Sequence, residues 1–124
     1  MSEKMIAEKM YLKTAKSLAI LNGEVHPSMV AQLPSELLVG DEQQAEVVLM
    51  FALNQKELEK WFPLALARLG EKGSLWVAFL KQSAAKATDI SRESISSYAR
   101  DQGVTGVATI SVDLDWSALR LKRL

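Results

Sequence analysis

The chain has 124 residues, and its 15 basic and 15 acidic side chains give a formal net charge of +0. This length fits one domain spanning residues 1–124, and a hydrophobic content of 48% excludes a disordered chain. The charge balance weighs against a protein that binds nucleic acid through bulk positive charge. The absence of cysteine excludes disulfide and thiolate chemistry, and one histidine without a spaced carboxylate cluster predicts no metal site.

No targeting or membrane segment is recognisable in the sequence. The start of the chain mixes Glu and Lys with Met and Ile and lacks the apolar core of a secretory signal. No apolar run approaches the roughly 18 residues that a membrane span needs. We therefore expect a cytoplasmic protein that does not bind a membrane.

The predicted strands are short, continuous apolar runs at Leu18–Leu21, 47–53 and 75–80. None of them alternates apolar with polar residues, which is typical of a parallel sheet that is covered by helices on both faces. A minor strand is expected at 36–39.

Helical patterns fill the gaps between the strands. We expect a helix at 4–12, and a short one that begins at Pro27, a favoured first helical position, and ends before Pro34. A further helix is expected to begin near Ser91 and to run to Gly103.

The longest helical pattern follows the second strand. Asn54 is its expected N-cap, and Glu57 is placed to accept a hydrogen bond from the backbone amide of Asn54. Pro63 is expected to kink or restart this helix, and Gly70 and Gly73 are expected to end it.

The C-terminal part of the sequence predicts a hairpin. Residues 104–112 form a strand pattern in which Gly106 is a candidate bulge, 113–116 form a turn, and 117–124 alternate apolar with charged residues. Strands joined by so short a turn are antiparallel. With right-handed crossovers, the expected fold is α/β: a three-layer, mostly parallel, Rossmann-like sheet closed by a C-terminal antiparallel hairpin.

Two segments carry a resemblance to an uncharacterised bacterial family, a domain of unknown function. They read LWVAFLK at 75–81 and VDLDWSALR at 112–120. Family members show a Leu-Trp-Val run that ends in Pro-Lys, and an acidic residue followed by Trp-Ser-Gly/Ala-Leu. Lys81 matches this pattern, whereas Leu80 stands where the family has Pro. The resemblance implies a small Rossmann-like domain and no particular activity.

The order of elements also resembles the second half of a class I methyltransferase that uses S-adenosylmethionine. That cofactor needs a glycine-rich turn after the first strand and an acidic residue after the second. Here Asn22, Gly23 and Glu24 follow the first strand, and the chain is about half the length of a complete two-half nucleotide-binding fold. We therefore expect no cofactor and no methyl transfer.

The candidate ligand site lies where the parallel strands end. Ligands of open parallel sheets bind beyond the carboxyl ends of the strands, and this edge would carry Asn22, Gly23, Asn54 and Lys81. Free amides at nearby helix N-termini favour a small anion or a nucleotide-like ligand. The alternative interpretation is structural: Asn54 caps a helix, Gly23 makes a turn and Lys81 is solvated.

A second candidate cluster lies at the hairpin and contains Asp113, Asp115, Trp116 and Ser117. Two carboxylates beside a hydroxyl could hold a divalent cation or orient a water molecule. We prefer the interpretation that the aspartates accept hydrogen bonds from turn amides while the indole packs over the end of the sheet.

His26, the sole histidine, is a candidate general base. Because sequence spacing fixes no Ser or Asp partner for it, we expect a surface residue beside a helix start, and we assign no catalytic residue.

Three functions remain open. The preferred one is a non-catalytic binding or regulatory module for a small ligand. The second is an enzyme of unrecognised type that uses Lys81 with Asp113 or Asp115. The third is a structural or interaction subunit, a homodimer formed through the C-terminal strands or the N-terminal helix.

Overall fold

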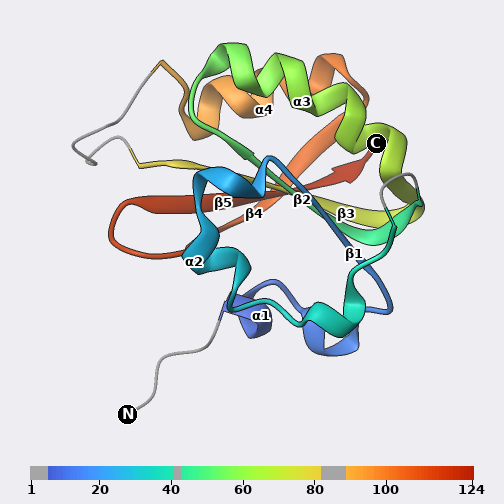
Figure 1. Cartoon of the computed structure of the whole chain (residues 1–124). Helices are drawn as coiled ribbons and strands as arrows, with labels where there is room; N and C mark the ends of the chain where they lie inside the picture. The colour runs from blue at the N-terminus through green and yellow to red at the C-terminus, as the bar shows by residue number, and fades with distance from the viewer. Residues whose placement is uncertain (1–5, 41–42, 82–88) are drawn as a thin grey trace.

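The computed structural model describes residues 6–40, 43–81 and 89–124, and its centre is a five-stranded sheet (Figure 1). The strands lie in the order β1-β2-β3-β5-β4. β1, β2 and β3 are mutually parallel, and β5 pairs antiparallel with both β3 and β4. The strand bounds are β1 Leu18–Leu21, β2 Ala45–Ala52, β3 Leu69–Leu80, β4 Val104–Ser111 and β5 Trp116–Arg123.

Helices cover both faces of this sheet (Figure 1). α3 and α4 lie on one face, and α1 and α2 lie on the other together with three short 3-10 turns. Their bounds are α1 Ile6–Lys9, η1 Leu12–Thr14, η2 Gly23–Val25, α2 Pro27–Val30, η3 Ser35–Leu37, α3 Gln55–Arg68 and α4 Arg92–Asp101. None of these helices, in the ranges that the structure describes, is long and apolar enough to cross a membrane.

Each face of the sheet has its own hydrophobic core. Because successive side chains of a strand point to opposite faces, β2 supplies Met50 to the core under α3 and Leu49 to the core under α2. Phe62 of α3 closes the first core, and Met29 of α2 closes the second. Burial on both faces explains the continuous apolar runs, and the expected three-layer α/β fold is confirmed.

Every predicted strand but one is present, although β2 covers Ala45–Ala52 where 47–53 was expected and β3 covers Leu69–Leu80 where 75–80 was expected. β1 has the expected bounds, and the register of β4 against β5 shifts between Gly106 and Ala108, where a bulge was expected. The exception is the minor strand at 36–39. That segment begins as η3, and only Leu38 makes an isolated bridge, with Leu18.

The helix predictions hold in type and differ in detail. Of the helix expected at 4–12, residues 4 and 5 lie outside the described residues, and α1 covers only Ile6–Lys9. α2 begins at Pro27 and α4 is capped by Ser91, both as expected.

The restart of α3 at Pro63 was a wrong prediction. The helix runs unbroken from Gln55 to Arg68, and Pro63 is on its exposed side. Leu58, Phe62 and Ala65 form one buried face across the proline, so packing offsets the hydrogen bond that the proline cannot make.

The expected end of α3 at Gly70 and Gly73 was also wrong, because both glycines lie within β3. A Cβ atom on Gly73 would lie 2.5 Å from the backbone oxygen of Glu46 and 2.8 Å from Cδ1 of Leu69. The glycine therefore permits a close approach of β3 to β2, next to the register shift between Ala45 and Val47.

Gly73→Ala is expected to lower the free energy of unfolding by about 2 kcal/mol, because the added methyl group overlaps backbone that cannot move aside. Urea denaturation measures the change. Gly40→Ala is the matched control and is expected to be nearly neutral, since its Cβ would meet only the flexible Gln43 side chain. Equal stability of the two variants would contradict this account of β3.

Candidate functional site

The parallel order brings the carboxyl ends of β1, β2 and β3 to one edge of the sheet, and Asn22 follows the first of them. Asn22 has a left-handed backbone (φ 59°). Its Nδ2 donates to the backbone oxygen of Phe51 at 2.9 Å and to Oε1 of Glu57 at 3.1 Å. The side chain therefore spans the gap between the ends of β1 and β2.

The Gln55 and Glu57 amides at the start of α3 have side-chain acceptors within the chain. Asn54 Oδ1 accepts from the Glu57 amide at 2.8 Å, as expected for the N-cap. Glu57 Oε1 accepts from the Leu53 amide at 2.9 Å, one residue before the expected donor. Asp89 Oδ1 accepts from the Gln55 amide at 2.8 Å. The positive end of this helix is thus complemented by the chain's own side chains.

Gly23 begins η2 and packs tightly against its surroundings. A Cβ atom at this position would lie 3.0 Å from Cγ2 of Ile20 and 3.1 Å from Cγ2 of Val30. The space that a glycine leaves open here is therefore filled by apolar side chains of the same chain.

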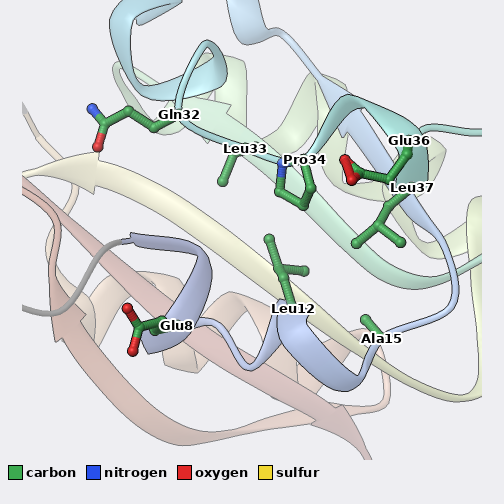
Figure 2. Close-up of a pocket in the computed structure, with 8 residues that line it drawn as sticks. All are labelled: Glu8, Leu12, Ala15, Gln32, Leu33, Pro34, Glu36 and Leu37. Carbon is green, nitrogen blue, oxygen red and sulfur yellow. The ribbon is translucent and has the colours of Figure 1, made fainter.

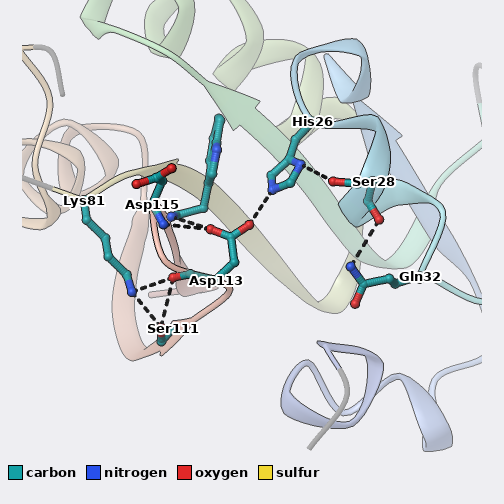
Figure 3. Close-up of polar contacts among 8 residues, drawn as sticks. His26, Ser28, Gln32, Lys81, Ser111, Asp113 and Asp115 are labelled. Atoms are coloured by element: carbon teal, nitrogen blue, oxygen red, sulfur yellow. Dashed lines mark hydrogen bonds and ion pairs between the residues drawn. The ribbon is translucent and has the colours of Figure 1, made fainter. Parts of the chain in front are cut away.

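Lys81 ends β3 and is bonded to the C-terminal hairpin (Figure 3). Its Nζ donates to Ser111 Oγ at 2.8 Å and to the backbone oxygen of Asp113 at 2.6 Å, and its amide donates to the Asp115 oxygen at 2.7 Å. The described contacts thus join Asn22 to Asn54 through Glu57. They join Lys81 to Asp113 and Asp115 of the cluster that was predicted at the hairpin.

His26 lies on the opposite side of Asp113 from Lys81 (Figure 3). Its Nε2 is 2.8 Å from Asp113 Oδ2, and Ser28 Oγ is 3.2 Å from its Nδ1. An ionised carboxylate only accepts, so Nε2 carries the proton; in the neutral ring, Nδ1 then accepts from the serine hydroxyl.

His26 stands at the start of α2, as expected, but it is more buried than the surface position that was expected for it. Its side chain is only 13% exposed, and its ring lies 5.1 Å from the ring of Trp116 and 6.2 Å from that of Phe51. Sequence reasoning missed this contact because 87 positions separate His26 from Asp113. The only local signal was a lone histidine directly before Pro27.

Asp113 organises the turn of the hairpin. Its Oδ1 accepts from the amides of Asp115 at 2.9 Å and Trp116 at 2.8 Å. Burial raises the pKa of Asp113, but the hydrogen bonds from His26 and these two amides outweigh it, so the pKa lies below its usual value. These contacts agree with the preferred interpretation of the hairpin cluster, in which the aspartate accepts hydrogen bonds from the amides of the turn.

The remaining members of that cluster do not converge on a cation site. Asp115 is exposed, and Ser117 lies within β5, paired with Phe79 and Ser111. Within the described ranges, no three His, Cys, Asp or Glu side chains are grouped to hold a metal ion.

Comparisons with known proteins identify the fold. No family model matches the chain, and no curated protein matches its sequence. A methyltransferase from Aquifex aeolicus that depends on S-adenosylmethionine is 9% identical, with a TM-score of 0.64 over 97% of this chain and 90% of that one.

With two other solved structures, the match covers a smaller share of the known protein. One is an O-methyltransferase family protein from Burkholderia thailandensis, which is 11% identical, with a TM-score of 0.60 over 90% of this chain and 52% of that one. The other is the mitomycin 7-O-methyltransferase MmcR, which is 10% identical, with a TM-score of 0.57 over 89% of this chain and 49% of that one. The chain thus spans about half the length of these two proteins. It has a methyltransferase-like fold, with the antiparallel hairpin at the C-terminal end of a parallel sheet.

Glu57→Ala is expected to lower the free energy of unfolding by about 2 kcal/mol, because the Leu53 amide and the Asn22 amide group both lose a charged acceptor. Chemical denaturation measures this. Glu59→Ala, on the exposed side of the same helix, is the control and is expected to change stability by less than about 0.5 kcal/mol. A Glu57 variant as stable as the control would refute the bridging role.

Asp113→Asn is expected to weaken the dependence of stability on acid pH. Because the pKa of Asp113 is lower in the folded state, the unfolded chain binds more protons, and stability rises with pH across the interval between the two values. The ionised side chain thus stabilises the fold above its unfolded pKa of roughly 4 and loses this effect as pH falls. Since the side chain is 42% exposed, the contribution is about 0.5 kcal/mol.

Denaturation curves between pH 3 and 5.5 test this prediction. The difference between wild type and Asp113→Asn should shrink as pH falls. Asp115→Asn, which leaves Asp113 and both its amide donors in place, should retain the wild-type profile. A constant offset between wild type and Asp113→Asn at every pH would contradict the assignment.

Proposed function

We propose that the chain is a non-catalytic module that binds a small anionic or nucleotide-like ligand at the carboxyl edge of β1–β3, with Lys81 as the binding cation. One observation carries the proposal: the Lys81 ammonium group is held by two uncharged oxygens, those of Ser111 and Asp113. In the described part of the chain, its nitrogen forms no ion pair.

The charge at Lys81 supports an anionic ligand. An ammonium group has three N–H donors, and the contacts among the described residues use two of them, both to the hairpin. The third is the donor that we assign to a ligand. The carboxylate of Asp113 is engaged by His26 and two backbone amides, whereas Lys81 contacts the backbone oxygen of that residue. Among the residues that the structure describes, no ion pair therefore neutralises the positive charge.

The methyltransferase-like fold raises the question of S-adenosylmethionine, on which the Aquifex aeolicus protein depends. The residues of this chain do not fit that cofactor. Asn22 bridges the crevice between β1 and β2, Glu57 places a carboxylate beside it, and the space next to Gly23 is filled. We therefore derive no methyl transfer from the fold.

The geometry favours binding over catalysis by Lys81 with an aspartate. An enzyme of that kind needs the ammonium and a carboxylate within hydrogen-bonding reach of each other, whereas Lys81 contacts the main-chain oxygen of Asp113. A homodimer through the C-terminal strands or the N-terminal helix stays a prediction, as does membership of the bacterial family suggested by 75–81 and 112–120.

A thermal-shift titration tests the proposal. Inorganic phosphate and adenosine monophosphate at millimolar concentration are expected to raise the melting temperature, since a ligand at 100 times its Kd stabilises by about 2.7 kcal/mol. Adenosine, which lacks the charge, and S-adenosylhomocysteine, which the crevice does not accommodate, are expected to give no shift.

The matched variants are Lys81→Met, which keeps the length of the side chain without its charge, and Lys72→Met, which removes an exposed charge elsewhere on β3. Stabilisation by phosphate should vanish in the first and persist in the second. If phosphate and adenosine monophosphate leave the wild-type melting temperature unchanged, or if Lys81→Met responds like wild type, the proposal fails.

A further inference from the structure

A second pocket lies away from the carboxyl edge, near the start of β1 (Figure 2). One wall comes from η1 and the residues after it, and the other comes from the segment that joins α2 to η3. Leu38, directly after η3, bridges to Leu18 at the start of β1, which fixes this end of the pocket. Its volume is about 460 Å³, within the range of sites for small molecules.

The centre of this pocket is apolar and already packed. Leu12 is 2% exposed and Leu33 is 7% exposed, and they face each other across the gap beside Pro34 and Leu37 (Figure 2). A ligand would therefore meet a formed hydrophobic surface and would not need to order it first.

Negative charge flanks the apolar centre. Glu8 of α1 lies at one end of the lining residues and Glu36 of η3 lies at the other (Figure 2). The ion pairs within the described ranges join His26 to Asp113 and Arg92 to Glu93, so neither pocket glutamate is paired there. Lys9, next to Glu8, donates instead to the backbone oxygen of Ser111.

From this arrangement we infer a binding site for an organic cation, an ammonium group on an apolar body of roughly six carbons. The apolar body contacts Leu12, Leu33 and Leu37, and the ammonium group lies by a glutamate at one end. An apolar anion of the same shape meets two carboxylates and is rejected. This site is independent of the one proposed around Lys81.

Titration of the full chain with hexylammonium, followed by amide chemical shifts in NMR spectra, tests this inference. Hexanoate and hexanol have the same apolar chain with negative and zero charge. Hexylammonium is expected to shift the amides of residues 8–15 and 32–37 and to bind at least about fivefold tighter than hexanol, and hexanoate is expected not to bind. The inference would be overturned if hexylammonium, hexanol and hexanoate bound equally well, or if the only amides that shifted lay outside residues 8–15 and 32–37.

Variants separate charge from shape. Glu8→Gln with Glu36→Gln removes the carboxylate at either end and is expected to weaken hexylammonium binding about fivefold, the effect of losing one exposed charge contact. Ala15→Leu is expected to block binding by filling the pocket. Glu24→Gln removes an exposed carboxylate outside the pocket, and Lys81→Met removes the proposed anion site; neither should alter the affinity. An unchanged affinity in the double glutamine variant would exclude the charge recognition.

Discussion

Burial of the two central strands on both faces is the constraint on which the rest of the structure depends. In β2 every side chain from Val47 to Ala52 is buried, and β3 is buried from Gly73 to Leu80. Each face then needs its own cover, which α3 and α4 supply on one side and α1, α2 and the 3-10 turns supply on the other. Because such a sandwich holds few polar groups, they collect where the strands end.

At the carboxyl edge, the chain satisfies most of these polar groups itself. Asn22 and Glu57 connect the end of β1 to the start of α3, and Asp89 supplies a further acceptor there. A methyltransferase-like fold is thus combined with a crevice that is bridged by its own side chains. Fold and activity are separable in this way because a site depends on particular side chains, whereas a fold depends on the pattern of burial.

Charge is arranged unevenly around the sheet although the formal net charge is +0. At the carboxyl edge, Lys81 is bonded to uncharged oxygens of the hairpin. Near the amino end of β1, Glu8 and Glu36 flank an apolar pocket. If both proposed sites bind their ligands, charges of opposite sign at separate places would let one small domain distinguish ligands by charge.

The sequence by itself determined the elements of this protein and most of their bounds. The runs at 18–21 and 75–80, the caps Asn54 and Ser91 and the turn at Asp113 all follow from contacts within a few residues. The exceptions include the strand expected at 36–39, which is largely a 3-10 turn. They also include Pro63 and Gly73, where packing against other elements outweighed local preference.

Only the tertiary structure decided which side chains share a site. Asn22 meets Glu57 across 35 positions and His26 meets Asp113 across 87, and no local spacing encodes either contact. Lys81 was expected at the same edge as Asn22 and Asn54, and its bonds to Ser111 and Asp113 of the hairpin were not foreseen. The physical reason is that periodicity records which face of an element is buried, whereas the partner of a polar side chain depends on how distant elements pack.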